Sequence, residues 1–272
     1  MSEDDKLKDA VRAVEGIVRA VPIYQDVVQP AAQEVGKALQ TVTKSIHVAI
    51  APIAALVWGY EQIRDFVSTR VAEKLQHVPP ENIQTPDATV VGPALEALKY
   101  AGSVESLREM YANLLAASLD KSTASDAHPS FVDIIKSLSS DEAKIMRLFI
   151  TSSSYPVVDV LARQNVGLVY RPAFSNFSFI GREAGCQLPL RTPSYLDNLS
   201  RLGLLEIPSG KSISGDNVYE PIETDPELAS VKAQIGEMPN THVDFERKVV
   251  TITNFGRQFC RACVIEKSVQ AV

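Results

Sequence analysis

The spacing of apolar residues between prolines is the feature that most constrains the first part of this 272-residue chain. Residues 4–21 carry apolar side chains at steps of three and four, which places them on one face of an α-helix. Pro22 ends or kinks this helix, and the same spacing predicts two more helices, at residues 30–46 and at about 52–75. The aligned positions of the first helix are Leu7, Val11, Val14, Ile17, Val18 and Val21.

Prolines and small polar residues interrupt the helical pattern at residues 79–92, which we interpret as a linker. Pro93 then favours a new helix start, because proline fits the first turn of a helix. Further helices are predicted at residues 104–119 and 130–138. The predicted organisation of this half is a helical hairpin region at 1–78, the linker at 79–92 and a helical middle region at 93–138.

The residues from Ser139 onward combine helical and extended patterns. The sequence Ser-Ser-Asp-Glu at 139–142 predicts a capped helix, because acidic groups near a helix N-terminus offset the helix dipole and its unpaired N–H groups. A second capped helix is predicted from Thr192 to Gly203, since glycine commonly follows a helix end. Later elements are a short strand at 204–207, a strand at 248–253 and a terminal helix from 254 to about 266.

This order of elements resembles a winged-helix domain, most clearly in residues 195–206 and 251–259. The predicted fold class is therefore mainly α, with an N-terminal helical bundle or hairpin followed by a winged-helix-like α+β domain. We assign that domain to residues 139–272 and place an acidic insertion in it, at about 223–246.

Charge argues against a nucleic-acid partner. The formal net charge is −6, and the residues from Ser139 to the C-terminus contain 14 Lys and Arg against 15 Asp and Glu. A DNA-binding domain is ordinarily basic. The weak candidate face for nucleic acid consists of Arg191 and Arg201, which flank the helix at 192–203 and are opposed by Asp197. Contact with a protein partner, or self-association, is the preferred interpretation of this domain.

The sequence predicts no enzyme, no cofactor, no metal site and no small-molecule substrate. Cys260 and Cys263 form a C-x-x-C pair, which lacks the second ligand pair of a zinc site and also fits two buried thiols on one helix face. The histidines have no partners at metal-binding spacing. Three cysteines and an acidic N-terminus without a following apolar run indicate the cytoplasm, with peripheral attachment to the inner membrane as the alternative.

An uncharged run between Lys44 and Glu61 is the most distinctive apolar segment. It is shorter than the roughly 20 residues of a membrane-spanning helix and contains Pro52. A buried core helix is favoured, and an interfacial hairpin with aromatic anchors is the alternative. The candidate face for a membrane or a partner consists of Ile46, Ile50, Ile53, Leu56, Val57, Trp58 and Tyr60.

Several long motifs resemble the abortive-infection alpha (Abi-alpha) family. They include Ala51-Pro-Ile-Ala-Ala-Leu-Val-Trp-Gly-Tyr-Glu and the segments at 20–39, 91–100, 107–116 and 193–199. The resemblance implies a bacterial protein associated with phage defence and supplies no catalytic residues. We expect a non-enzymatic defence protein that acts through protein–protein or membrane contact. The alternatives are a toxin-neutralising immunity or inhibitor protein and a winged-helix DNA-binding regulator.

Overall fold

The structure, a computed structural model, describes residues 57–167, 169–215 and 217–266. They form two compact units. The first unit contains the described residues up to Ser137 and those from Ala262 onward, and the second unit is Leu138–Arg261. The predicted helices at 4–21 and 30–46 lie outside the described residues, and so do Ile46, Ile50, Ile53 and Leu56 of the candidate face.

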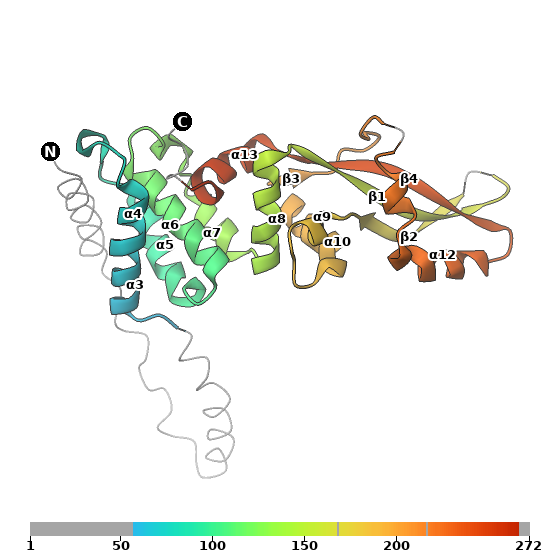
Figure 1. The fold of residues 1–272 in the computed structure, drawn as a ribbon, viewed down its shortest axis with the longest axis horizontal. Coiled ribbons are helices and arrows are strands. Elements are labelled where there is room, and N and C mark those ends of the chain that lie inside the picture. Colours follow the sequence, from blue (N-terminus) through green and yellow to red (C-terminus); the bar gives the residue numbers. More distant parts are fainter. Residues whose placement is uncertain (1–56, 168, 216, 267–272) are drawn as a thin grey trace, which may run out of the picture. The chain divides into compact units, whose positions relative to one another are not determined.

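The first unit is helical (Figure 1). Its elements are α3 (Tyr60–Phe66), a π-helical stretch (Val67–Val71), α4 (Ala72–Leu75), α5 (Ala88–Ala101), α6 (Glu105–Leu119) and α7 (Ser130–Lys136), with short 3-10 turns at Pro80–Asn82 and Ala124–Asp126. The first three run on without a break and are the described part of the predicted helix at 52–75. The predicted helices at 104–119 and 130–138 are confirmed by α6 and α7.

Helix α6 forms the core of the first unit. Every residue from Met110 to Leu119 is buried, and α4, α5 and α7 pack around it. The hydroxyl of Tyr111 donates a hydrogen bond to the carbonyl of Val132 on α7 at 3.1 Å. The buried ammonium of Lys74 lies 3.1 Å from the carboxylate of Glu109, so this charge is paired where burial would otherwise be costly.

The helix predicted to begin at Pro93 begins earlier, and this prediction was wrong. The side chain of Asp87 accepts a hydrogen bond from the backbone N–H of Thr89 at 2.8 Å and so caps a helix that begins at Ala88. Pro93 therefore lies inside α5. The residues just before the cap also pack on α6, since the N–H of Gln84 donates to the carbonyl of Leu119 at 2.9 Å.

The second unit mixes helices and strands. Its elements are α8 (Ser140–Thr151), β1 (Ser154–Gln164), β2 (Tyr170–Phe177), α9 (Ile180–Glu183), α10 (Thr192–Arg201), β3 (Leu205–Glu206), α11 (Glu220–Glu223), α12 (Ala229–Gly236), β4 (Thr241–Ile252) and α13 (Asn254–Phe259), with 3-10 turns at Pro189–Arg191 and Pro226–Leu228. A π-helical stretch, Cys260–Val264, follows α13.

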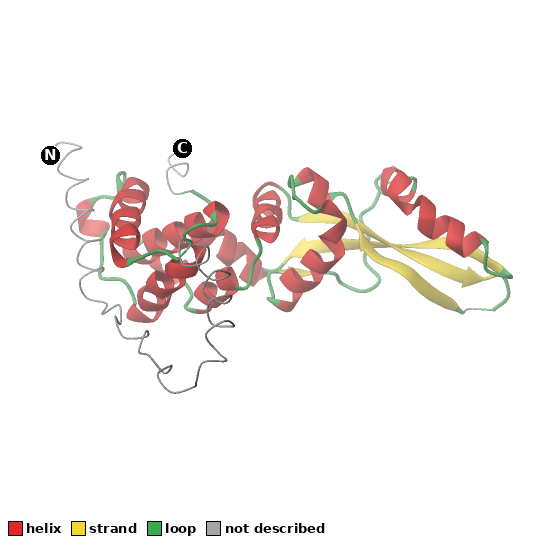
Figure 2. Ribbon diagram, turned by 90° about the horizontal axis from the view of Figure 1, so that it is seen from below, coloured by secondary structure: helices red, strands yellow, loops and turns green. Residues whose placement is uncertain are grey.

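The strands form one antiparallel sheet, drawn in yellow in Figure 2. Their order in the sheet is β2-β1-β4-β3. Strands β1 and β4 pair along their length, from Ser154 opposite Thr251 to Gln164 opposite Thr241. One face of β1 packs on the residues around α11 and α12. This core contains Val158, Val160, Ala162, Phe177, Tyr219, Ile222, Leu228 and Ile235.

Sequence patterns found some elements of the second unit and missed others. The capped helix at Ser139, the short strand β3 and the helix that begins at Asn254 are confirmed. The helix from Thr192 is also confirmed, but its N-terminus has no side-chain cap, so that part of the prediction was wrong. Strands β1 and β2 were not predicted, and the acidic insertion at 223–246 contains α12 and the first half of β4. The described chain is therefore mixed α+β rather than mainly α.

Asp141 fixes the loop before α10. Its buried carboxylate accepts hydrogen bonds from the backbone N–H groups of Gln187 (2.9 Å) and Leu188 (3.1 Å) and from the hydroxyl of Tyr195 (3.0 Å). Burial alone would raise the pKa of Asp141, but these donors and Lys144 outweigh it and hold the pKa below its usual value of 3.8. The ionised carboxylate is therefore part of the folded structure.

We predict that Asp141→Ala destabilises the second unit. Two backbone N–H groups would lose a charged acceptor in part-buried hydrogen bonds, which costs about 3 kcal/mol and lowers the melting temperature by roughly 6–12 °C. Calorimetry at neutral pH measures this loss, and Glu237→Ala, at an exposed site, is the control. Because the folded-state pKa is lowered, the contribution of Asp141 is present above pH 3.8 and is lost as the pH falls through the folded-state pKa. An equal difference between wild type and variant throughout that acid range would contradict this account.

Candidate functional site

Three residues of the candidate membrane or partner face are described. Val57 and Tyr60 are 36% and 40% exposed, and Trp58 between them is half-buried. The structure therefore places the end of the uncharged run at the surface of the first unit, directly before α3.

Trp58 is seated against the end of α5. Its backbone N–H donates to the carbonyl of Lys99 at 2.8 Å, and its ring covers Gly102 so closely that a Cβ there would lie 2.2 Å from a ring atom. The ring also meets Phe66 edge-on, with centroids 5.3 Å apart, and the guanidinium of Arg108 lies 6.0 Å from its centroid. These contacts fix the position of Trp58 within the first unit.

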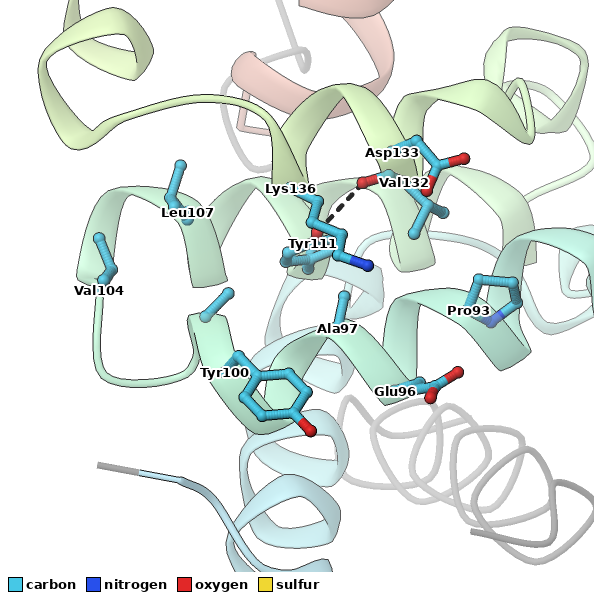
Figure 3. A pocket seen from close by; sticks show the side chains of 11 residues that line it. Pro93, Glu96, Ala97, Tyr100, Val104, Leu107, Tyr111, Val132, Asp133 and Lys136 are labelled. Carbon is cyan, nitrogen blue, oxygen red and sulfur yellow. Dashed lines mark hydrogen bonds between the residues drawn. The ribbon is translucent and has the colours of Figure 1, made fainter. Parts of the chain in front are cut away.

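A groove of about 290 Å³ lies between α5, α6 and α7 in the same unit (Figure 3). Its surface is mainly apolar, and three charged residues, Glu96, Asp133 and Lys136, stand at the edge. The apolar and aromatic lining consists of Pro93, Ala97, Tyr100, Ala101, Val104, Leu107, Tyr111 and Val132. Such a surface suits an apolar partner better than a polar substrate.

Two tyrosines of the groove differ in their surroundings. Tyr100 is 69% exposed, whereas Tyr111 is fully buried and its hydroxyl is bonded to the carbonyl of Val132. Burial, with smaller effects of Asp133 and Cys263, raises the pKa of Tyr111 well above its usual value. Tyr111 is therefore a neutral structural group at neutral pH, and Tyr100 is the aromatic side chain available for contact.

Trp58 and the groove use different residues of the α5 region. Lys99 and Gly102 contact Trp58, whereas Tyr100 and Ala101 line the groove. Sequence reasoning identified Trp58 and Tyr60 but not the groove. The only local sequence signal for the groove is the three- and four-residue spacing that places Ala97, Ala101 and Val104 near one another.

The weak nucleic-acid face has two separate basic residues. Arg191 and Arg201 are both exposed, at opposite ends of α10. The guanidinium of Arg201 donates to the side-chain oxygen of Asn198 at 2.6 Å, and Asp197 on the same helix accepts from Asn176 at 3.2 Å. The structure does not bring these two arginines together into one basic cluster.

Five other cations of the described second unit are paired with carboxylates. Lys248 lies 2.6 Å from Asp159, and Arg182 makes two hydrogen bonds to Asp225, the shorter at 2.6 Å. The remaining pairs of this kind are Arg163 with Asp244, Arg247 with Glu223 and Lys144 with Asp141. Phosphate contacts would therefore compete with existing ion pairs.

The two thiols of the C-x-x-C pair are buried. Burial raises the pKa of Cys260 to about 12, which leaves it protonated at neutral pH. Within residues 57–167, 169–215 and 217–266, no cluster of three or more His, Cys, Asp or Glu side chains has the arrangement of a metal site. No helix in those ranges has the length and apolar character needed to cross a membrane.

Comparison with known proteins places the chain in a family. Residues 59–263 match the model of the family described as abortive infection alpha. No curated protein matches the chain. A solved structure of an uncharacterized protein from the hydrocarbon-degrading marine bacterium Alcanivorax borkumensis SK2 is similar over 51% of this chain and 92% of that one, with 20% identity. Its TM-score is 0.34, so this likeness carries no argument about the fold.

We predict that Gly102→Ala displaces Trp58. The added Cβ would overlap the ring, whereas Gly92→Ala on the same helix meets nothing within 4 Å and is the matched control. Trp58 is the sole tryptophan, so its emission reports this site directly. We expect a red-shifted emission and faster acrylamide quenching in Gly102→Ala, and neither change in Gly92→Ala. Unchanged fluorescence in Gly102→Ala would mean that the ring does not occupy this seat in solution.

Proposed function

Because the chain belongs to the abortive infection alpha family, we propose that it takes part in abortive-infection defence against phage as a non-enzymatic protein that binds a protein partner. The observation that carries the proposal is the family match at 59–263, which includes most of the described residues of both units. The chain would act by contact, and its N-terminal half would be the active part.

The surface of the first unit supports action by contact. The first unit has an apolar groove lined by an exposed tyrosine, Tyr100, and a further exposed tyrosine, Tyr60, lies at the start of α3. Tyrosine and tryptophan are enriched at protein interfaces, because they combine a large apolar area with a polar tip. A membrane surface is the competing partner for the same residues, and binding to anionic liposomes distinguishes it from a protein.

The element order in Leu138–Arg261 supports a winged-helix-like origin of the second unit. Helix α10 is followed by β3, as in the resemblance noted from the sequence, and β4 and α13 come after the inserted helices α11 and α12. The sheet extends beyond that pattern through β1 and β2. We propose that this unit also serves protein contact, since several of its cations are paired with carboxylates of the same unit.

Phage challenge tests the proposed function. Bacteria that carry the gene should give fewer plaques than bacteria without it for at least some phages of a broad panel. Most infected cells should die before phage release, because abortive infection protects the population rather than the infected cell. Equal plaque counts across the panel would remove the proposal. A secreted toxin encoded next to the gene would instead favour an immunity protein.

A second experiment addresses nucleic acid. We predict no sequence-specific duplex binding near about 150 mM salt and only weak binding at low salt, because non-specific affinity depends on unpaired cations. Gel shifts measure this, with Arg191→Ala and Arg201→Ala as the variants to compare. Nanomolar, site-dependent binding at that salt concentration that is lost in both variants would establish a DNA-binding regulator.

A further inference from the structure

We propose that the outer edge of β4, from Val243 to Arg247, binds an extended segment of a partner protein in which apolar and basic residues alternate. The segment would run antiparallel to β4 and add a strand to the sheet through backbone hydrogen bonds. The inference rests on the proposed role of the second unit in protein contact, and it adds to that role a site and the chemistry of the partner.

The hydrogen bonds between β1 and β4 show which backbone groups of β4 point away from β1. The N–H of Ile252 donates to the carbonyl of Ser153 at 3.1 Å, and the N–H of Asn165 donates to the carbonyl of Asn240 at 2.9 Å. Both bonds continue the unbroken register of this pair by one residue at either end. In an antiparallel pair every second residue directs its N–H and C=O toward the partner strand. The even-numbered residues of β4 therefore face β1, and the odd-numbered residues face outward.

Among the described residues, no strand pairs with this outer edge over most of β4. Strand β3 is short and pairs with only the last two residues of β4. The outward-facing N–H and C=O groups in the middle of the strand belong to Val243, Phe245 and Arg247. The N–H of Phe245 donates to the carboxylate of Asp244 at 2.9 Å, which is the neighbouring side chain on the same strand. Such an edge is a template for pairing with another chain.

The opposite edge of the sheet, formed by β2, is protected against strand addition. The N–H of Gln164 donates to the carbonyl of Val169 at 3.0 Å, so the same alternation places Pro172 at an outward-facing position. Proline has no N–H to donate, and register shifts further interrupt the pairing of β2 with β1. The two edges therefore differ, and the edge of β4 is the one suited to pairing.

The side chains of β4 define the chemistry of the added strand. Val243 and Phe245 pack against the apolar core around α11 and α12, so apolar side chains of a neighbouring strand would lie beside them. Glu246, on the other face, is exposed and lies opposite Asp159 in the register. Lys248 already pairs with Asp159, and no cation of the described chain pairs with Glu246. A basic residue on the added strand would neutralise Glu246.

Charge disfavours a second copy of β4 as the occupant. Two such edges related by a two-fold axis would pair about one central residue. Pairing centred at Asp244 or at Glu246 sets that carboxylate opposite its own copy, and pairing centred at Phe245 sets Asp244 opposite Glu246. Like charges directly opposite each other are destabilising. A basic segment of a different protein meets no such repulsion.

Peptide binding to the full-length chain tests the proposal. The probe is a fluorescein-labelled peptide of alternating valine and lysine, and fluorescence anisotropy measures its binding. Two further peptides carry backbone N-methyl groups, on the valines in one and on the lysines in the other. Valines that lie beside Val243 and Phe245 direct their N–H groups at β4, whereas the lysines direct theirs away from it. Only N-methylation of the valines therefore removes the proposed hydrogen bonds.

We expect N-methylation of the valines to weaken binding at least about tenfold, because several backbone hydrogen bonds are lost, and N-methylation of the lysines to have little effect. Glu246→Lys should weaken binding of the lysine peptide roughly threefold to fivefold and favour a peptide of alternating valine and glutamate. Glu183→Lys is the matched control, because it makes the same change of charge at an exposed site on α9. Both substitutions are at exposed positions, so the melting temperature should stay unchanged.

Equal binding of the two methylated peptides would overturn the proposal, because binding would then not depend on backbone pairing. Equal weakening by Glu183→Lys and Glu246→Lys would assign the binding to the net charge of the chain instead. Absence of binding at millimolar peptide would also overturn it, and a dimer in sedimentation that excludes the peptide would assign the edge to a second copy. Plaque counts do not enter this test, so its failure is distinct from failure of the defence role.

Discussion

The pairing of β1 with β4 is the constraint on which the second unit depends. These strands are distant in the sequence, yet each residue from Ser154 to Gln164 has a partner between Thr251 and Thr241. Strand β2 adds to β1 and β3 adds to β4, so the other strands have no place in the sheet without this pair. The residues around α11 and α12 then cover Val158 and Val160 on one face. Without the central pair, these helices would have no apolar surface to cover.

The same pairing accommodates a buried charge. Asp159 lies within the buried stretch of β1, where an isolated carboxylate would be strongly unfavourable. Lys248 on β4 lies 2.6 Å from it, and the backbone N–H of Asn176 on β2 donates to it at 2.7 Å. A polar residue in the centre of the sheet is thus satisfied by the two strands that flank it. Such a group favours the correct register, because a shifted strand would leave the charge unpaired.

Local signals explain which elements the sequence predicted. The Ser139 cap needs only its own side chain and Glu142, and both hydrogen bonds of the capping box form. Gly203 ends the helix region with a φ of 75°, which glycine adopts without strain. Strand β1 gives no such signal. Pro156 and Asp159 interrupt its apolar run, and residues on both faces are buried, so alternation is absent. Only its distant partner identifies it as a strand.

The candidate site shows the same division between local and distant information. Trp58 and Tyr60 stand out in the sequence as aromatic residues at the end of an uncharged run, and the structure places both at the surface of the first unit. The groove depends on three helices, and Tyr100 has no pattern of its own that marks it as a contact residue. Gly102 positions Trp58 through its missing side chain, because only the absence of a Cβ lets the Trp58 ring lie against the end of α5.

The distribution of charge separates the roles of the two units. In the second unit, Arg182 and Arg247 pair with Asp225 and Glu223, which ties the segment around α11 to α9 and β4. These cations contribute to folding, and binding an external phosphate would break their internal ion pairs.

In the first unit the charged residues of the groove stand only at its edge, and its interior is apolar. Recognition there would come from burial of apolar and aromatic surface, with the edge charges selecting among partners rather than providing most of the affinity. The apolar groove between α5, α6 and α7 is accordingly the described surface of the first unit best suited to a binding role.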